Sequence, residues 1–259
     1  MQPFQLFMAN SPILSRRRFI GLFILASAAG VVLLGRMPLA TRQGVNFHVS
    51  SHTIPAYAKV IGFLHRHYEY QALAEDITRK CKSAQECAPI IFFWTRSHIR
   101  STPQGWPVVD DHILNIIIRG HGLDDQMADV FTTLCAYAGM PAFWTSVKQP
   151  DRKGSIVLSF VKIDNRWAVM DVSRGLVFRR SDGQLASIDD LQADKSILTA
   201  AAGSLRLYGN AYADFLSPLA MPKIPRPLRA ELQMPRPRIW FELGRLLGYS
   251  AKEEHYGLE

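Results

Sequence analysis

The stretch Arg119–Ala142 constrains the fold most, because both ends of one helix can be located within it. Asp124 or Asp125 can cap the start, since a short carboxylate accepts hydrogen bonds from free backbone N–H groups. Gly139 suits the left-handed residue that follows a helix, and Pro141 prevents continuation. Apolar residues recur at helical spacing between these limits, namely Met127, Val130, Phe131, Leu134 and Ala138. The sequence therefore predicts a buried central helix.

Strand patterns follow the central helix. Residues Ala142–Val147 are strand-like, and Ile156–Ile163 and Arg166–Val172 are two apolar, β-branched runs. Asp164 and Asn165 stand between these two runs, which predicts a β-hairpin. A further strand is expected at 176–178, a turn at 181–183 and a short helix from 187. The chain after the central helix is thus expected to form a small antiparallel sheet.

Helical patterns precede the central helix. We expect helices at Tyr57–Tyr70 and Ala72–Lys80, and a strongly apolar helix over Ile90–Ile99. The sequence Ser83–Glu86 has the form of a capping box. Pro89 conflicts with a helix that starts at Ser83, so we expect a kink or a later start there. Residues 40–55 are interpreted as a linker with a short strand near 45–49.

Three motifs together resemble the transglutaminase-like (papain-like cysteine protease) superfamily. They are Ala128 within the central helix, the helix ending Gly139–Ala142, and Asn165–Trp167 followed by Asp171 on a strand. The apolar helix containing Trp94 also matches the helix that precedes the nucleophile in this family. The resemblance covers roughly Tyr57 to Leu191 and implies an α+β, papain-like fold with helices packed on a small antiparallel sheet.

The resemblance also locates three positions of a Cys-His-Asp triad, of which one keeps its residue type. The nucleophile position falls on Asp124, the histidine position on Ile156 (on Ser155 after a slip of one residue), and the aspartate position on Asp171. A triad needs a thiolate and a base that carries its proton. Neither is present at these positions, so no residue is assigned a catalytic role in acyl transfer. Cys135 lies on the apolar side of the central helix and is interpreted as a packing residue.

Other candidate sites are weaker. His65 and His67 are two residues apart, which on a helix places them on different faces, so they do not form a metal pair. The run Asp110–His112 is interpreted as a solvated turn in preference to a cation site, and His121 as an exposed loop residue near the motif. We therefore expect no metal ion and no cofactor. The carboxylates Asp124, Asp125 and Asp171 leave open a hydrolase of a different kind.

An uncharged apolar run, Phe19–Gly35, follows the arginines Arg16–Arg18. Its length reaches the lower limit for a bilayer-spanning helix, and the arginines favour a cytoplasmic N-terminus. Ser15–Ile20 also resembles a twin-arginine export signal. Residues Pro38–Ala40 fit a cleavage site poorly, so an uncleaved signal anchor is favoured over a cleaved signal. The predicted location is the cytoplasmic (inner) membrane, single-pass, with the main domain periplasmic or otherwise extracytoplasmic.

The three cysteines and the basic balance bear on compartment and partners. Cys81 and Cys87 can pair in an oxidising compartment, and two free thiols remain an equal alternative. The net charge is +8 and the pI is about 9.6. Such a chain suits a membrane surface, envelope proteins or an anionic polysaccharide. No nucleic-acid motif accompanies the charge, so nucleic acid is not expected as a partner.

These patterns predict three regions. Residues 1–45 contain a cytoplasmic N-terminus, the anchor (19–35) and a linker, and residues 46–217 form the transglutaminase-like domain. Residues 218–259 form a Pro/Arg-rich basic tail, which is interpreted as extended rather than core, with a short amphipathic helix at 239–247. The favoured function is a catalytically inactive, membrane-anchored binding or scaffolding module in cell-envelope assembly, such as exopolysaccharide production. The alternative is an envelope hydrolase or transferase that uses rearranged residues around Asp124 and Asp171.

Overall fold

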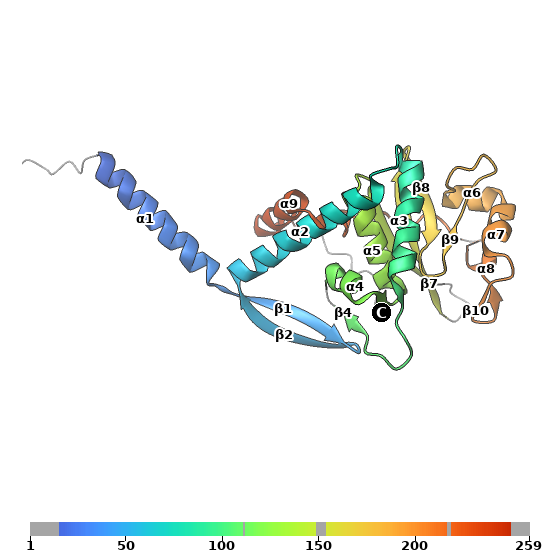
Figure 1. The fold of residues 1–259 in the computed structure, drawn as a ribbon, viewed down its shortest axis with the longest axis horizontal. Helices are drawn as coiled ribbons and strands as arrows, with labels where there is room; N and C mark the ends of the chain where they lie inside the picture. Colours follow the sequence, from blue (N-terminus) through green and yellow to red (C-terminus); the bar gives the residue numbers. More distant parts are fainter. Residues whose placement is uncertain (1–15, 111, 149–153, 217–218, 250–259) are drawn as a thin grey trace, which may run out of the picture. The chain divides into compact units, whose positions relative to one another are not determined.

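The computed structural model describes residues 16–110, 112–148, 154–216 and 219–249 (Figure 1). Several sequence-based expectations involve residues outside these ranges: Ser15 of the twin-arginine resemblance, Asp111, Pro218 and the last ten residues. By its internal contacts the chain divides into two units, one formed by residues 1–41 and 52–61 and the other by residues 42–51 and 62–259. Of the predicted domain, 46–217, residues 52–61 fall in the first unit and the rest in the second.

The first unit contains the apolar N-terminal helix α1 (Arg16–Gly35). Its section Arg18–Gly35 is long and apolar enough to cross a bilayer, and its large apolar side chains are exposed. The predicted helix over 19–35 is therefore confirmed. An N-terminal signal sequence has the same length and composition, so the helix alone is weak support for a permanent anchor.

The segment after α1 forms two strands, β1 (Pro38–Val45) and β2 (His48–Pro55), so the interpretation of residues 40–55 as a linker was wrong. Asn46 and Phe47 join them, and both have positive φ, 48° and 64°. A two-residue turn of this kind matches the twist of the flanking strands. Asn-Phe is not the usual Asn-Gly signal, which explains why the sequence pattern failed here.

The second unit is built on an antiparallel sheet with the strand order β6-β7-β8-β9. The strands are β6 (Ala142–Lys148), β7 (Ser155–Ile163), β8 (Arg166–Asp171) and β9 (Leu176–Val177). Asp164 and Asn165 join β7 to β8 with φ values of 48° and 63°, as a type I′ hairpin requires. The predicted sheet and its hairpin are confirmed.

Helices from the first half of the domain share one core cluster with this sheet (Figure 1). These are α2 (Ala56–Thr78), α3 (Ala84–His98), α4 (Ile113–Arg119) and α5 (Asp124–Tyr137). Phe92 of α3 and Phe131 of α5 pack edge to face, with ring centroids 5.9 Å apart. Helix α5 contributes to the core along its whole length, and Val161 and Met170 of the sheet pack into the same cluster. The central helix is thus buried between α3 and the sheet.

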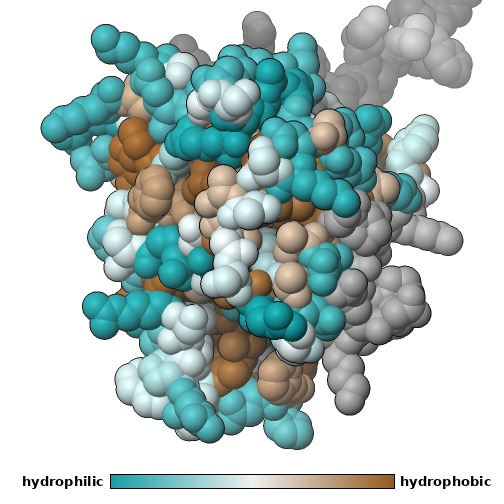
Figure 2. Space-filling model, turned by 90° about the vertical axis from the view of Figure 1, so that its right-hand side faces the viewer, coloured by the Kyte–Doolittle hydropathy of each residue, from teal (hydrophilic) through white to brown (hydrophobic). Residues whose placement is uncertain are grey.

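The opposite face is covered by α6 (Ile188–Ala193), α7 (Lys195–Ala202) and α8 (Ala213–Leu216). Ser187 caps α6 with a side-chain acceptor for Asp190 N–H, as its sequence indicated. The outer surface on this side is mostly hydrophilic, with smaller hydrophobic areas between (Figure 2). The domain therefore has three layers, and both faces of its sheet are buried.

The remaining strands are short pairs beside these layers. They are β3 (Arg100–Ser101), which pairs with β5 (His121–Gly122) in parallel, β4 (Val109–Asp110), which pairs with β1, and β10 (Arg206–Leu207), which pairs with β11 (Asn210–Ala211). The β3–β5 pair fixes the backbone just before α5.

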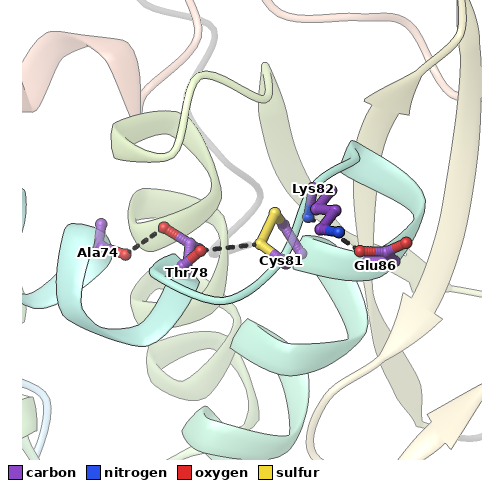
Figure 3. The surroundings of a disulfide bond; sticks show 6 residues. Ala74, Thr78, Cys81, Lys82 and Glu86 are labelled. Carbon is purple, nitrogen blue, oxygen red and sulfur yellow. Dashed lines mark hydrogen bonds between the residues drawn. A yellow bond between two sulfur atoms is a disulfide. The ribbon is translucent and has the colours of Figure 1, made fainter.

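A disulfide between Cys81 and Cys87 connects the end of α2 to α3, with the two Cα atoms 5.4 Å apart (Figure 3). Helix α2 is continuous, where two helices had been expected. Helix α3 begins at Ala84 and includes Pro89, so the later start was wrong. The capping box was also wrong, because Glu86 accepts from Lys82 N–H at 2.9 Å instead of from the N-cap.

The segment after residue 218 is partly packed, which corrects its interpretation as a tail outside the core. Leu228 and Ala230 are buried, and the Tyr137 hydroxyl donates to the Gln233 carbonyl at 2.8 Å. The prolines hold the backbone extended without preventing burial of the apolar residues between them. A 3-10 turn, η1 (Glu231–Gln233), leads into α9 (Pro235–Leu246), which confirms the predicted terminal helix.

Candidate functional site

The start of α5 is held by a glutamine and an arginine. Leu123 is the N-cap, and Asp124 is the first helical residue, so the prediction that Asp124 or Asp125 caps the helix was wrong. Gln126 Oε1 accepts from Leu123 N–H at 3.2 Å and from Arg119 Nη2 at 2.9 Å. A polar side chain therefore satisfies the backbone at the helix start and leaves the Asp124 carboxylate available for another partner.

The end of α5 follows the predicted pattern. Gly139 has φ +81°, its N–H donates to the Ala136 carbonyl at 3.0 Å, and Met140 N–H donates to the Cys135 carbonyl at 2.9 Å. These two bonds form a Schellman motif. Cys135 is fully buried, and burial raises the pKa of its thiol well above the ordinary value. Its role as a packing residue is confirmed.

Asp171 lies at the end of β8 and is completely buried. Its carboxylate accepts from the Tyr212 hydroxyl at 2.7 Å, from the Ser173 hydroxyl at 3.0 Å and from the Arg174 backbone N–H at 3.0 Å. Burial, together with the adjacent Asp171 charge, raises the pKa of Tyr212 well above its usual value, so the hydroxyl remains a donor. In the family pattern this aspartate orients a histidine, whereas here tyrosine, serine and arginine occupy its acceptor positions.

Arg174 connects the nucleophile position to the aspartate position. Its Nη1 lies 3.2 Å from Asp171 Oδ2, and its Nη2 lies 3.1 Å from Asp124 Oδ2. Burial lowers the pKa of the guanidinium, but the two carboxylates outweigh this effect and the pKa is raised. One arginine, with its side chain 15% exposed, thus lies between the two carboxylates that the sequence singled out.

The turn that carries Arg174 is itself held by α3. Arg96 Nη1 donates to the Ser173 carbonyl at 2.6 Å. Gly175 has φ +73°, and a Cβ there would lie 3.3 Å from Arg96 Nε. Both the left-handed backbone and the close approach of Arg96 favour glycine. The Arg174 side chain is therefore supported from α3, from β8 and from the glycine turn.

The histidine position of the family has no titratable replacement. Ile156, on which the sequence motif places the histidine, is fully buried with Phe160 and Phe178 on the sheet face away from α5. Val157 instead packs against Ala128 of α5. Side chains alternate along a strand, so Ser155 shares the face of Val157. The residue one place earlier, Ser155, is therefore the better equivalent of the two, and its hydroxyl is not a base at neutral pH.

A second acidic site on α5 was missed by the sequence. Asp129 lies one turn after Asp125, accepts from the Trp144 indole N–H, and pairs with Arg229 Nη2 at 2.9 Å. Burial raises the pKa of Asp129 and of Asp125, and Arg229 opposes both shifts. The only sequence signal was an aspartate between the apolar residues Met127, Ala128, Val130 and Phe131.

The candidate histidines have partners of their own, and the interpretation of His121 as an exposed loop residue was wrong. His121 lies in β5, half-buried, with its ring edge-on to Trp106. His67 Nδ1 lies 2.9 Å from the Tyr137 hydroxyl, whereas His65 pairs with Glu69 at the exposed surface. Among the described residues, no group of three or more His, Cys, Asp or Glu is arranged to hold a metal ion.

The geometry places clear limits on chemistry at Asp124 and Asp171. A carboxylate paired with a guanidinium is a weak nucleophile, because the N–H donors engage the lone pairs of its oxygens. The acceptor positions of Asp171 are used by Tyr212, Ser173 and Arg174. The arrangement therefore resembles a structural ion network more closely than an acid–base pair.

The solved structures that are similar to this chain include two described as putative proteases and one described as a TGase. A "putative cysteine protease" from Cytophaga hutchinsonii matches with a TM-score of 0.37 and 15% identity, over 46% of this chain and 40% of its own. A "putative protease" from Parabacteroides distasonis matches with a TM-score of 0.32 and 14% identity, over 54% and 40%. A structure described as a TGase matches with a TM-score of 0.34 and 10% identity, over 57% and 47%.

The chain spans less than half the length of each of these structures. No protein-family model matches the chain, and none of the curated proteins matches it. At TM-scores below 0.5 these likenesses carry no conclusion about activity. The described residues form an α+β fold in which α3 and α5 pack on the antiparallel β6–β7–β8–β9 sheet.

Proposed function

We propose that this protein is a membrane-anchored, catalytically inactive transglutaminase-like domain that acts as a binding or scaffolding module in the cell envelope. One observation carries the proposal: the nucleophile position holds Asp124, whose carboxylate is paired with Arg174 at 3.1 Å. The same arginine pairs with Asp171, so two of the three family positions belong to one ion network. The third position offers isoleucine or serine.

No cysteine of the chain can replace the missing nucleophile. Cys135 is buried on α5 with a raised pKa, and Cys81 and Cys87 are joined. A thiol must ionise and reach its substrate to act. The chemistry of the family therefore lacks its reactive atom here.

The proposed location draws on two features. The arginines 16–18 precede the apolar helix α1, which favours a cytoplasmic N-terminus and a single-pass anchor. The Cys81–Cys87 disulfide suits an oxidising compartment outside the cytoplasm. A role in exopolysaccharide assembly is an extension of this location, with envelope proteins or an anionic polysaccharide as partners.

The experiment that tests inactivity is an amide-hydrolysis and transamidation assay on the purified full chain, with and without iodoacetamide. We expect no turnover in either condition. A matched variant, Asp124→Cys with Ser155→His, supplies a thiol and a base at the two family positions and controls for substrate access. Turnover by the natural sequence that iodoacetamide abolishes would contradict the proposal.

The alternative, a hydrolase or transferase that uses Asp124 and Asp171, requires these carboxylates to act on a substrate. The Arg174 bridge disfavours it, because the cation and the buried hydrogen bonds occupy both groups. Turnover on ester, amide or glycoside substrates that is lost in Asp124→Asn, with the fold retained, would favour this alternative.

The scaffolding role needs a separate experiment. Envelope proteins should co-purify with the full chain and should remain after Asp124→Ala, since binding does not depend on the replaced nucleophile. Loss of all partners in a folded Asp124→Ala variant would place the binding function at this carboxylate.

A further inference from the structure

Helix α9 presents an apolar surface that the domain leaves uncovered. Five apolar side chains of α9 and its C-cap are exposed, namely Ile239 (58%), Trp240 (74%), Leu243 (42%), Leu246 (83%) and Leu247 (73%). Phe241, by contrast, is half-buried. Most of the large apolar side chains of α9 therefore face outward.

The spacing of these residues places them on one face. Ile239, Leu243 and Leu246 follow at intervals of four and three, and Trp240 and Leu247 form a neighbouring row. Exposed apolar residues scattered singly need no explanation, but a continuous row on one helix face marks an interaction surface.

Basic residues accompany the apolar face. The helix contains Arg236, Arg238 and Arg245 and one acidic residue, Glu242, a net charge of +2. Glu242 pairs with both Arg238 and Arg245 on the side of the helix away from the apolar row. Arg236 precedes Ile239 by three residues and Trp240 by four, so it lies beside the apolar row itself.

We propose that α9 is an interfacial helix that lies on an anionic phospholipid bilayer, with Trp240 and the leucines among the lipid headgroups. Helices that lie in a membrane interface combine an apolar face with arginine or lysine, and tryptophan favours the depth of the headgroups. This inference rests on the proposed membrane anchor α1, which would keep the domain close to a bilayer and raise the effective concentration of the surface.

A second copy of the chain fits this face less well. Five side chains fall far short of the roughly 20–30 residues per partner in a stable protein interface. A parallel pairing of two copies would also bring the two Arg236 side chains together, which like charges oppose. An anionic surface, in contrast, complements the arginine in the middle of the apolar row.

The experiment uses the full chain reconstituted into vesicles of phosphatidylcholine alone or of phosphatidylcholine mixed with phosphatidylglycerol. A fluorophore is attached to Leu246→Cys in α9 or, as the matched control, to the exposed Lys195→Cys in α7. Quenching by brominated phospholipids then reports which label contacts lipid. The natural sequence, whose single free cysteine is buried, measures background labelling.

We expect quenching of the label at position 246 in the anionic vesicles, little quenching at position 195, and weaker quenching at 246 without phosphatidylglycerol. Adding Arg236→Gln should reduce the partition of α9 about fivefold, the effect of one basic residue at an anionic surface. The same change in charge made by Lys195→Gln should leave quenching at position 246 unchanged.

Equal quenching at positions 246 and 195, or quenching at 246 that is independent of phosphatidylglycerol, would overturn the proposal. Protection of the 246 label in lipid-free detergent that rises with protein concentration would also overturn it, because a second copy would then cover α9. Vesicle flotation separates this outcome from failure of the anchor: a chain that floats with an unquenched label retains its anchor and lacks the α9 contact.

Discussion

Two aspartates of the central helix pair with arginines, and the two pairs differ in which partner is buried. Asp124 is 43% exposed and shares Arg174 with the fully buried Asp171. Asp129 is 10% exposed and pairs with Arg229, which is itself 42% exposed. In the first pair the arginine is the buried centre of a network, and in the second the carboxylate is buried and the arginine lies at the surface.

The two buried carboxylates, Asp171 and Asp129, differ in how much each depends on its arginine. Asp171 accepts from a tyrosine, a serine and a backbone N–H in addition to its pairing with Arg174. Burial raises the pKa of Asp129, so protonation relieves the cost of burying its charge. Asp171 therefore depends on four donor groups, whereas Asp129 can lose its charge by taking up a proton.

The largest expected effect comes from removing each arginine in turn. Arg174→Met should lower the free energy of unfolding by about 3 kcal/mol or more, because it leaves the buried Asp171 without its cation. Arg229→Met should cost less, about 1–2 kcal/mol, because Asp129 can take up a proton. Urea denaturation of the two variants at neutral pH measures both values.

The double variant Arg174→Met with Asp171→Asn is the control, since it removes both charges and should recover part of the loss. Equal costs for the two single variants would refute the distinction between the sites.

The second test uses pH. The folded-state pKa of Asp129 is raised, so the folded state binds this proton more readily than the unfolded state. The corresponding stabilisation is present below the unfolded pKa of about 3.9 and is lost as pH rises through the folded pKa. Asp129→Asn cannot lose a proton, so its stability relative to the natural protein should rise with pH from about pH 4 upward.

Unfolding curves at matched pH values check this sign. The raised pKa of Asp125 remains in both proteins and cancels in the difference. A relative stability of Asp129→Asn that falls with increasing pH would mean that Arg229 dominates over burial.

The smallest effect is expected at the nucleophile position. Asp124→Ala removes a partly exposed ion pair and a charge at a helix start, and should cost about 0.5–1 kcal/mol. Asp124→Asn keeps the shape of the side chain and separates the charge from the packing. Chemical denaturation of both variants gives the values, and a loss above about 2 kcal/mol would show that Asp124 supports Asp171 through Arg174 more strongly than its exposure suggests.

The sequence allowed the sheet and the central helix to be predicted because their signals are local. The apolar spacing of α5, the glycine at 139 and the Asp164-Asn165 turn each act within a few residues. The hairpin β1–β2 was not predicted, because its strands are polar and Asn46-Phe47 is an uncommon turn. The packing of Leu228 was not predicted, because a single apolar residue in a proline-rich segment makes no periodic pattern.

The site could be predicted only in part for a related reason. Asp124 and Asp171 were identified from motifs, but Arg174 is fifty positions from Asp124, and no local pattern predicts their 3.1 Å contact. The Tyr212 hydroxyl reaches Asp171 from a segment with no motif at all. The sequence motif placed the histidine position at Ile156. The structure was needed to show that this side chain lies on the face of β7 away from α5.

Thiol titration shows whether the folded protein has a nucleophilic thiol, on which the proposed inactivity depends. We expect the native full chain to consume no thiol reagent, because Cys135 is buried and Cys81 is joined to Cys87. Denaturation without a reductant should expose one thiol, and denaturation with a reductant three. A thiol that reacts rapidly in the native, unreduced protein would contradict the proposed inactivity.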